Sequence, residues 1–147
     1  MSEQRLLRSV QRLSAALSRL ERHTASREGV SVSQLRVLLS LSRDEAHARM
    51  RISDLAEEQG LAVSTMTRNV MVLEKKGWVS RHVGDHDRRV VFIQLTEPGR
   101  QLAQSLESAT RTELFRAFRA FHPSDRVERA VALDRVAAAL EGLEQAT

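Results

Sequence analysis

LAVSTMTRNVMVLEKKGWVSRHVGDHDRRVVFIQLT, residues 61–96, contains a helical pattern followed by two strand-like runs. In its first half, Met66, Val70 and Leu73 recur at intervals of four and three residues, which places them on one face of a helix. Polar side chains cluster around the first turns: Ser64, Thr65, Thr67 and Arg68. Two lysines precede Gly77, which can adopt the left-handed conformation that ends helices. We therefore predict a helix with one buried face and a polar, exposed leading end, stopping at Gly77.

The second half of this segment predicts two antiparallel strands joined by a charged turn. Trp78–Val83 and Val90–Leu95 are rich in β-branched and aromatic residues, and the second run alternates as a half-buried strand does. The connection Gly84–Arg89 contains a glycine and acidic turn-forming residues, and it carries two arginines near its tip. Because no apolar residue anchors the tip, we expect it to project. A helix followed by an arginine-tipped hairpin has a shape that fits DNA.

Composition limits the classes of function that the chain can have. Its 147 residues, 41% hydrophobic and 29% charged, are typical of a single globular domain. The net charge of +4 favours an anionic partner, although solvated surface charges explain it as well. The absence of cysteine excludes disulfides, thiolate metal sites and cysteine nucleophiles. No apolar run is long enough to span a bilayer and the N-terminus does not resemble a secretion signal, so we expect a cytoplasmic protein.

Two helices are predicted before the central segment. The first covers residues 3–23, because an apolar seam recurs at spacings of four and three: Leu6, Val10, Leu13, Leu17 and Leu20. This seam needs a partner helix. Residues 24–30 are polar and contain a glycine, so we expect them to form the connection. Ser31 and Gln34 have the spacing of a capping box, which predicts a second helix from there to about Arg43.

A third, short helix completes a helix-turn-helix. Residues 44–51 are polar and predict a loop, with a short strand added to the hairpin as the alternative. Ser53 and Asp54 suit a helix start, and the helix that follows would bury Leu55 and Ala56 and end at Gly60. Its short connection to the helix of residues 61–76 has helix-turn-helix proportions, in which the second helix reads DNA.

After the hairpin, the pattern is helical again. Thr96 suits an N-cap, and the helix should run to about Phe121, where His122-Pro123 breaks it. A final helix should begin at Ser124-Asp125 with these apolar residues: Val127, Val131, Val136, Leu140 and Leu143. The terminal helices can pack on their own domain or on a second copy of the chain. Three phenylalanines near the end of the long helix suit core or dimer interface better than the lining of a ligand cavity: Phe115, Phe118 and Phe121.

Two motifs, TMTRNVMVLEKKGWVSR (65–81) and DRRVVFIQLTEPGR (87–100), resemble the MarR/SlyA family of bacterial transcription regulators, and the resemblance extends from about Leu6 to Leu143. It implies one MarR-like domain over residues 1–147, mainly α with a small β-hairpin wing. The winged helix-turn-helix DNA-binding lobe would cover 31–96, and the dimerisation helices 1–24 and 97–147. It also implies a homodimeric repressor on palindromic operators, with a small-molecule effector.

Candidate DNA contacts lie first on the predicted recognition helix. Arg68 lies on its polar side, where a guanidinium can donate two hydrogen bonds to a guanine edge or bind phosphate, or simply be solvated. Ser64, Thr65 and Thr67 are short donors for phosphates or base edges, although the first two can instead satisfy backbone groups at the helix start. Ala62 occupies the position where a capping side chain is expected, so the helix start lacks a strong cap.

The predicted wing carries the second group of candidates. Arg88 and Arg89 suit a wing that inserts a cation into the narrow minor groove, or they merely keep a hairpin tip soluble. The resemblance implies that Arg89 is the family's wing arginine and that Asp87 is the acid that supports it, with Arg88 free to bind phosphate. Which arginine enters the minor groove stays open. The chain lacks the proline that often precedes the Asp-Arg run in this family.

Other chemistries receive little support from the sequence. His82, His86 and the neighbouring aspartates surround the hairpin tip, where side chains converge poorly on a metal ion, so we expect no metal site and no cofactor. No nucleophile elbow, phosphate loop or paired-carboxylate signature is present, so we expect no catalytic residues and no enzyme. The alternative to an operator-specific regulator is a helical adaptor or architectural protein of the same fold that lacks specific operator recognition.

Overall fold

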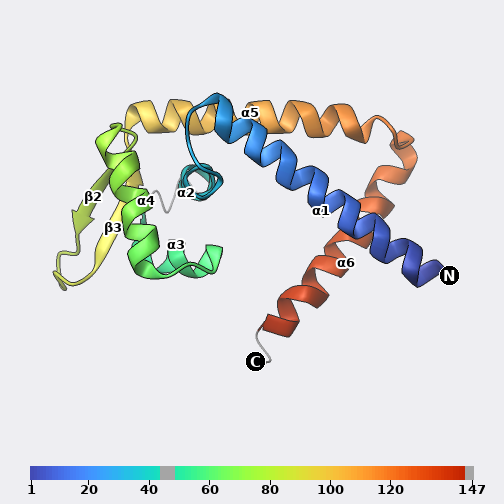
Figure 1. Cartoon of the computed structure of the whole chain (residues 1–147), viewed down its shortest axis with the longest axis horizontal. Coiled ribbons are helices and arrows are strands. Elements are labelled where there is room, and N and C mark those ends of the chain that lie inside the picture. Colours follow the sequence, from blue (N-terminus) through green and yellow to red (C-terminus); the bar gives the residue numbers. More distant parts are fainter. Residues whose placement is uncertain (44–48, 145–147) are drawn as a thin grey trace. The chain divides into compact units, whose positions relative to one another are not determined.

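The computed structural model describes residues 1–43 and 49–144 (Figure 1). Its elements, in chain order, are α1 (Ser2–Arg27), α2 (Val32–Ser42), β1 (Arg49–Arg51), α3 (Ile52–Gln59), α4 (Val63–Lys75), β2 (Val79–Val83), β3 (Val91–Leu95), α5 (Glu97–Phe118), the 3₁₀ helix η1 (Pro123–Asp125) and α6 (Arg126–Glu144). The chain divides into two compact units, Met1–Thr110 and Arg111–Thr147, and the boundary falls within α5. Each unit is described by itself.

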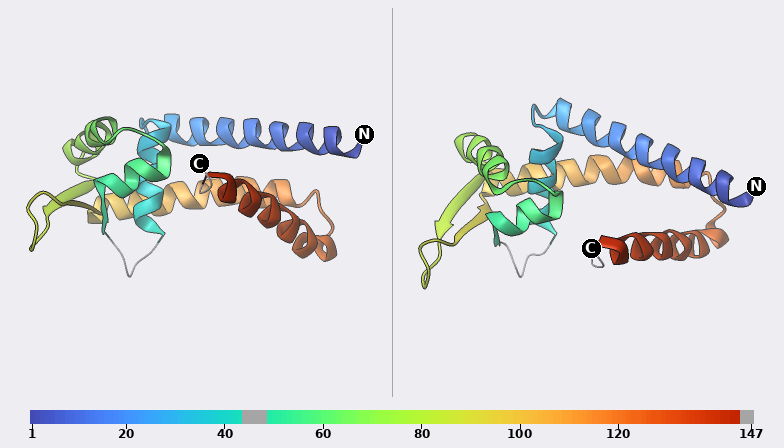
Figure 2. Two further views of the ribbon diagram at one scale, coloured as in Figure 1. Left: turned by 90° about the horizontal axis from the view of Figure 1, so that it is seen from below. Right: turned by 60° about the horizontal axis from the view of Figure 1, so that its bottom comes forward.

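The first unit contains a three-stranded antiparallel sheet in the order β1-β3-β2. The central strand β3 pairs Ile93 with Met50 on one side and with Arg81 on the other. Both predicted hairpin strands are confirmed, each beginning one residue later than expected. The strand considered within residues 44–51 is also present, as Arg49–Arg51, while residues 44–48 lie outside the described part. The hairpin of β2 and β3 extends beyond the helices α3 and α4 (Figure 2).

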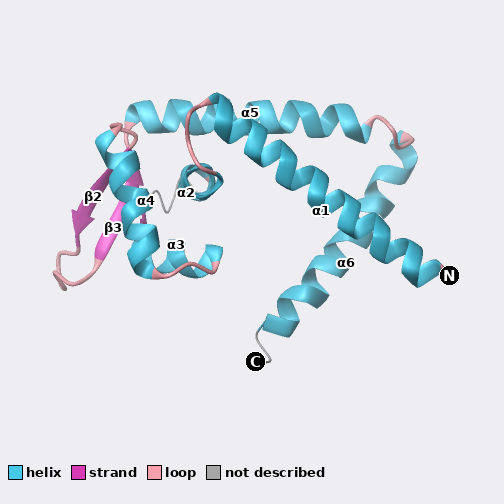
Figure 3. Cartoon of the chain, viewed as in Figure 1, coloured by secondary structure: helices cyan, strands magenta, loops and turns pink. Residues whose placement is uncertain are grey.

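The core of the first unit lies between the helices and one face of this sheet. The predicted inner face of α4 is confirmed, because Met66, Val70 and Leu73 are all 0% exposed. They join other buried side chains from α2, α3, β3 and the first half of α5: Leu38, Leu55, Ile93, Ala103 and Leu106. Gly60, with φ of 62°, turns the chain between α3 and α4. The fold is therefore a winged helix-turn-helix, mainly α with a small sheet (Figure 3).

Two predicted caps are confirmed by their hydrogen bonds. The Ser31 hydroxyl oxygen accepts from the Gln34 backbone N–H at 3.1 Å, and the Gln34 side chain accepts from the Ser31 N–H at 3.1 Å. At the start of α5, the Thr96 hydroxyl oxygen accepts from the Gly99 N–H at 3.1 Å. The Thr96 hydroxyl also donates to the Gly77 carbonyl oxygen at 2.5 Å, and this bond links the end of α4 to the start of α5.

Several helix boundaries differ from the prediction, and the final helix begins at Arg126, after η1, rather than at Ser124. The expected connection 24–30 is wrong in its first half, because α1 continues to Arg27: Thr24 and Ala25 are buried, and their packing extends the helix by a turn. α3 begins at Ile52, one residue before Ser53, with Arg51 as its N-cap residue. α5 ends at Phe118 rather than Phe121, because the next residues tighten into i to i+3 hydrogen bonds before Pro123.

Apolar side chains on the terminal helices are exposed. On α1, Leu6, Val10 and Leu13 of the predicted seam are each more than 40% exposed. The second unit has the same property along α5 and α6: Phe115, Phe118, Val127, Val131, Val136 and Leu140 are all exposed. None of the helices in the described residues is both long enough and apolar enough to span a membrane.

Candidate nucleic-acid interface

The leading end of α4 is exposed because the opposite side of the helix is buried. Met66, Val70 and Leu73 occupy the core, so Ser64 and Arg68 face outward, while Thr65 and Thr67 are half-buried. Ala62 is the N-cap residue and supplies no side-chain cap, as expected for a residue whose side chain cannot accept a hydrogen bond. Arg68 forms no ion pair with any described residue. Its guanidinium is therefore available to a ligand at the surface of α4.

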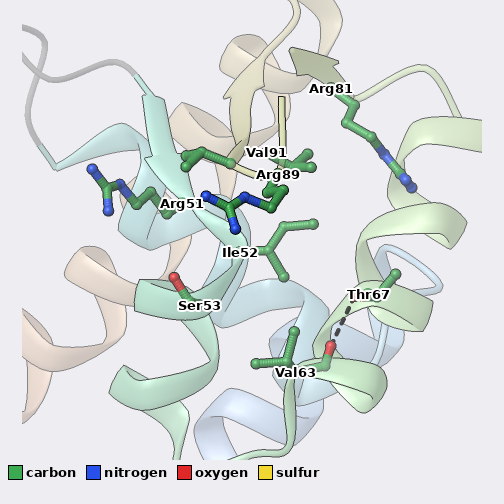
Figure 4. A pocket seen from close by; sticks show the side chains of 9 residues that line it. Arg51, Ile52, Ser53, Val63, Thr67, Arg81, Arg89 and Val91 are labelled. Atoms are coloured by element: carbon green, nitrogen blue, oxygen red, sulfur yellow. Dashed lines mark hydrogen bonds between the residues drawn. The ribbon is translucent and has the colours of Figure 1, made fainter. Parts of the chain in front are cut away.

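The hydroxyls at this end of α4 are not equivalent. The Thr67 hydroxyl donates to the Val63 carbonyl oxygen at 2.8 Å, one turn earlier, as the dashed line in Figure 4 shows. Thr67 therefore has lone pairs, but no spare hydrogen, for an incoming group. Ser64 and Thr65 make no side-chain hydrogen bond within the described residues, so their hydroxyls can donate to an acceptor from outside.

A polar network fixes the middle of α4. The Asn69 side-chain amide donates to the Ser33 hydroxyl oxygen at 2.8 Å, and that hydroxyl donates to the Gln59 side-chain oxygen at 2.7 Å. The Gln59 amide in turn donates to the Ser33 carbonyl oxygen at 3.2 Å. Each residue comes from a different helix, α2, α3 or α4, and no local sequence pattern marks any of the three as part of the site. The helix is thus held by a polar contact as well as by its apolar face.

The wing tip is shaped by Asp87. Its carboxylate accepts from the Arg89 backbone N–H at 3.0 Å, from Arg89 Nε at 3.2 Å and from Arg89 Nη2 at 3.4 Å. The hydrogen bonds from the Arg89 backbone and side chain lower the pKa of Asp87 below its ordinary value of 3.8, and the positive charge of Arg51 adds to this. The Arg89 side chain stays 92% exposed, and Arg88 is exposed beside it. The acid therefore holds the backbone and one edge of the guanidinium of Arg89, while most of the side chain remains open to solvent.

A basic groove of about 290 Å³ lies between the start of α4 and the wing (Figure 4). We call it the basic groove, and its lining residues are Arg51, Ile52, Ser53, Val63, Thr67, Arg81, Arg89, Val90 and Val91. Arg81 is held by Glu74, with Nε 3.1 Å from the carboxylate. Among the three arginines, only Arg89 was predicted. Arg51 belonged to a presumed loop and Arg81 to a strand, and only the strand pairing brings them to the same groove as α4.

Within residues 1–43 and 49–144, no three His, Asp or Glu side chains converge as metal ligands. His82, one of the histidines considered for such a site, instead has its ring Nε2 3.0 Å from the Ser80 hydroxyl.

Comparison with known proteins yields a family and a fold. The model of the MarR family matches residues 30–91. The HTH-type transcriptional regulator YfiV of Bacillus subtilis is 32% identical over 97 residues, covering 66% of this chain and 59% of that protein. The transcriptional repressor MprA of Escherichia coli is 32% identical over 79 residues, covering 54% and 44%. The chain thus spans about half the length of these relatives.

Solved structures extend the similarity to nearly the whole chain. AbsC, a MarR family transcriptional regulator from Streptomyces coelicolor, is 27% identical with a TM-score of 0.77, covering 96% of this chain and 95% of that one. The C80S mutant of MarR from E. coli, complexed with operator DNA, is 21% identical with a TM-score of 0.69, covering 89% and 92%. At that identity the second likeness shows the fold alone.

Proposed function

The chain belongs to the MarR family, and from this membership we propose that it is a transcriptional regulator that binds palindromic operator DNA as a homodimer. The observation that carries the proposal is the pairing of two exposed basic elements on one lobe. Arg68 is presented by the outer face of α4, and Arg88 and Arg89 by the wing tip. Similar proteins are named as repressors, which supports repression as the outcome of binding.

The proposed contacts follow from the two elements. α4 enters the major groove, where Arg68 meets a guanine edge and Ser64, Thr65 and Thr67 meet phosphates or base edges. The wing reaches the adjacent minor groove, where Arg89, oriented by Asp87, supplies the cation and Arg88 binds phosphate. The DNA-binding lobe is then residues 31–96. Since such contacts need the chromosome, the protein acts in the cytoplasm, and its role is binding rather than catalysis.

A second copy of the chain is proposed as the partner of the terminal helices. Soluble proteins rarely leave contiguous apolar faces exposed unless another surface covers them. α1 and α6 both present such faces, and a symmetric dimer covers the same patch on each copy. Residues 1–24 and 97–147 would then be the dimerisation helices, which hold two recognition helices roughly 34 Å apart for successive major grooves.

Regulation by a small molecule is the remaining part of the proposal. A ligand that binds one conformation of the dimer more tightly shifts the population toward it, and this changes DNA affinity by the same coupling free energy. A screen of small aromatic and anionic compounds, read by melting temperature and by operator affinity, tests this part. If neither the melting temperature nor the operator affinity changes across the screen, regulation by such a ligand is contradicted.

The main test is selection of preferred duplexes from a random pool, followed by titration of the selected and random duplexes. We expect tight, salt-sensitive binding with a clear preference for an inverted repeat. Arg68→Ala should cost about 1–3 kcal/mol on the selected duplex and relax the base preference at one position. Arg89→Ala should weaken binding to selected and random duplexes alike.

Three other outcomes distinguish the rival functions. Binding without preference but with strong salt dependence would identify an architectural DNA-binding protein. Weak binding that hardly changes with salt would identify a helical adaptor that kept the fold. Equal losses on all duplexes for both variants would reduce Arg68 to a phosphate contact.

A further inference from the structure

The basic groove separates the two elements that the proposed function assigns to DNA. One wall is the first turn of α4, with Val63 and Thr67. The other wall is the wing, with Arg89 and the start of β3, and the floor is formed where β1 meets α3 at Arg51 and Ser53. Figure 4 shows these walls facing each other across the groove. If α4 lies in the major groove and the wing in the minor groove, the part of the DNA between these two grooves must pass over this floor.

In duplex DNA, the structure between a major groove and the next minor groove is a single sugar-phosphate strand. We propose that the basic groove binds this strand, and that Arg51 and Arg81, which no local sequence pattern marks, contact its phosphates. The inference rests on the proposed function and deepens it, because it names two contacts outside α4 and the wing tip.

The direction of the arginines favours a strand over a small anion. A compact anion is bound best by guanidiniums that converge on one point. In Figure 4 the guanidiniums of Arg51 and Arg89 point to one side and that of Arg81 points to the other, so the three do not converge on one point. A DNA strand carries one charge per about 3.4 Å of helix axis, so divergent cations along a groove suit it. The groove is therefore shaped for an extended polyanion.

The present partners of the arginines leave them able to bind phosphate. Arg81 is one-third exposed and paired with the half-exposed Glu74, which aligns it without shielding it from solvent. Arg51 makes no ion pair within the described residues, and its guanidinium carbon lies 5.8 Å from the centre of the Phe92 ring. Exposed ion pairs and such ring contacts are weak, so phosphate can replace or share them.

Arg49 provides a matched control for Arg51. It lies on the same strand, two residues earlier and on the same face, and its guanidinium carbon is 4.7 Å from the Phe92 ring. Both arginines line a second groove, of about 220 Å³, around the wing tip, but Arg49 does not line the basic groove. Replacing either arginine by alanine removes one positive charge and one ring contact. Only Arg51→Ala removes a cation from the basic groove.

The experiment measures affinity for the selected and random duplexes over a salt series. Arg51→Ala and Arg81→Ala should each weaken binding about tenfold on both duplexes and reduce the salt slope by about one, because a phosphate contact is sequence-independent. Arg49→Ala should change affinity less than twofold, and Arg51→Lys should recover most of the loss. Melting temperatures close to that of the wild type confirm that Arg51, the N-cap residue of α3, is not needed for folding.

Neutral phosphates locate the contact. A methylphosphonate placed singly along the strand between the recognised half-site and the flanking minor groove should weaken wild-type binding at one or two positions. At the position opposite Arg51, the same replacement should cost the Arg51→Ala protein nothing further. Equal losses of DNA affinity for Arg49→Ala and Arg51→Ala would overturn the inference. So would methylphosphonate effects that are as large in both variants as in the wild type. A wild-type protein with no preference for the selected duplex would instead overturn the proposed function.

Discussion

α4 and α6 carry apolar residues at similar helical spacings, yet these residues have opposite environments. Met66, Val70 and Leu73 of α4 are 0% exposed, whereas Val131 and Leu140 of α6 are 50% and 56% exposed. The first set is covered by helices and a sheet of the same unit, and the second set is exposed among the described residues of its own unit. Periodicity therefore shows that a face will pack, but the partner is set by tertiary structure. The core of the lobe is therefore buried, whereas the apolar faces of the terminal helices are exposed.

The largest difference between these regions should appear when leucines are truncated. Leu38→Ala creates a cavity in the fully packed lobe and should lower the free energy of unfolding by about 2–5 kcal/mol. Leu7→Ala, at a side chain of α1 that is 58% exposed and outside the predicted seam, should cost less than about 1 kcal/mol. Urea denaturation of both variants at one protein concentration measures this. Similar losses of unfolding free energy in the two variants would mean that the lobe and the terminal helices do not differ in packing as described.

Two glycines sharpen the comparison, because replacement by alanine should change the stability in opposite directions at the two positions. A Cβ at Gly99 would overlap the Trp78 carbonyl oxygen, so Gly99→Ala should destabilise the lobe by about 1–3 kcal/mol. A Cβ at Gly142 in α6 would meet nothing within 4 Å, so Gly142→Ala should stabilise by up to about 1 kcal/mol through helix propensity. Thermal unfolding reports both. A loss at Gly142 would show that a partner backbone approaches α6 at that point.

A charge placed on each exposed surface tests which one is an interface. Val136 on α6 is 46% exposed and Val72 on α4 is 42% exposed, so they form a matched pair. Val136→Glu should weaken the proposed dimer at least about tenfold, or 1.4 kcal/mol, because it buries a carboxylate without a partner. Val72→Glu should leave the association unchanged. Sedimentation equilibrium over a range of concentrations gives both constants, and equal association of the two variants would exclude α6 from the interface.

The smallest effect should be local to the wing and depend on pH. The pKa of Asp87 is lowered in the folded protein, so its contact with Arg89 is fully present above the ordinary value of 3.8 and is lost as pH falls through the lower folded value. An NMR titration of the Asp87 carboxyl should therefore show a midpoint below 3.8. In Arg89→Ala, which keeps the backbone N–H bonded to Asp87, the midpoint should rise part of the way toward 3.8. An unchanged midpoint would mean that the Arg89 side chain does not hold the acid in solution.

The parts of the fold that sequence predicts are those coded within one element. The buried face of α4, the capping box at Ser31, the Thr96 cap and the hairpin strands each depend on residues a few positions apart. Helix ends were predicted less well, because burial of Thr24 and Ala25 depends on what α1 meets in space. Local spacing cannot reveal such a neighbour.

The candidate site divides in the same way. Arg68, Arg89 and Asp87 are identified by their positions in one helix or one turn, and their DNA contacts stay predictions. Arg51 and Arg81 come from different strands, and they share the basic groove only because both strands pair with β3. Likewise, Ser33 and Asn69 are 36 residues apart in the chain and meet only when α2 packs beside α4. Local sequence patterns do not reveal residues that come together only through strand register and helix packing.

The start of α4 has no side-chain cap, which should leave its first turn less ordered than the rest of the helix. The Met66 N–H is bonded to the Ala62 carbonyl oxygen at 3.0 Å, while the amides of residues 63–65 precede this ladder and receive no side-chain cap. Asn69, one turn further on, is locked by its network. Amide hydrogen exchange should therefore rise steeply from Asn69 back to Val63 in the free protein. The first turn is then the most adaptable part of the helix, and in the proposed complex it becomes ordered only when DNA binds.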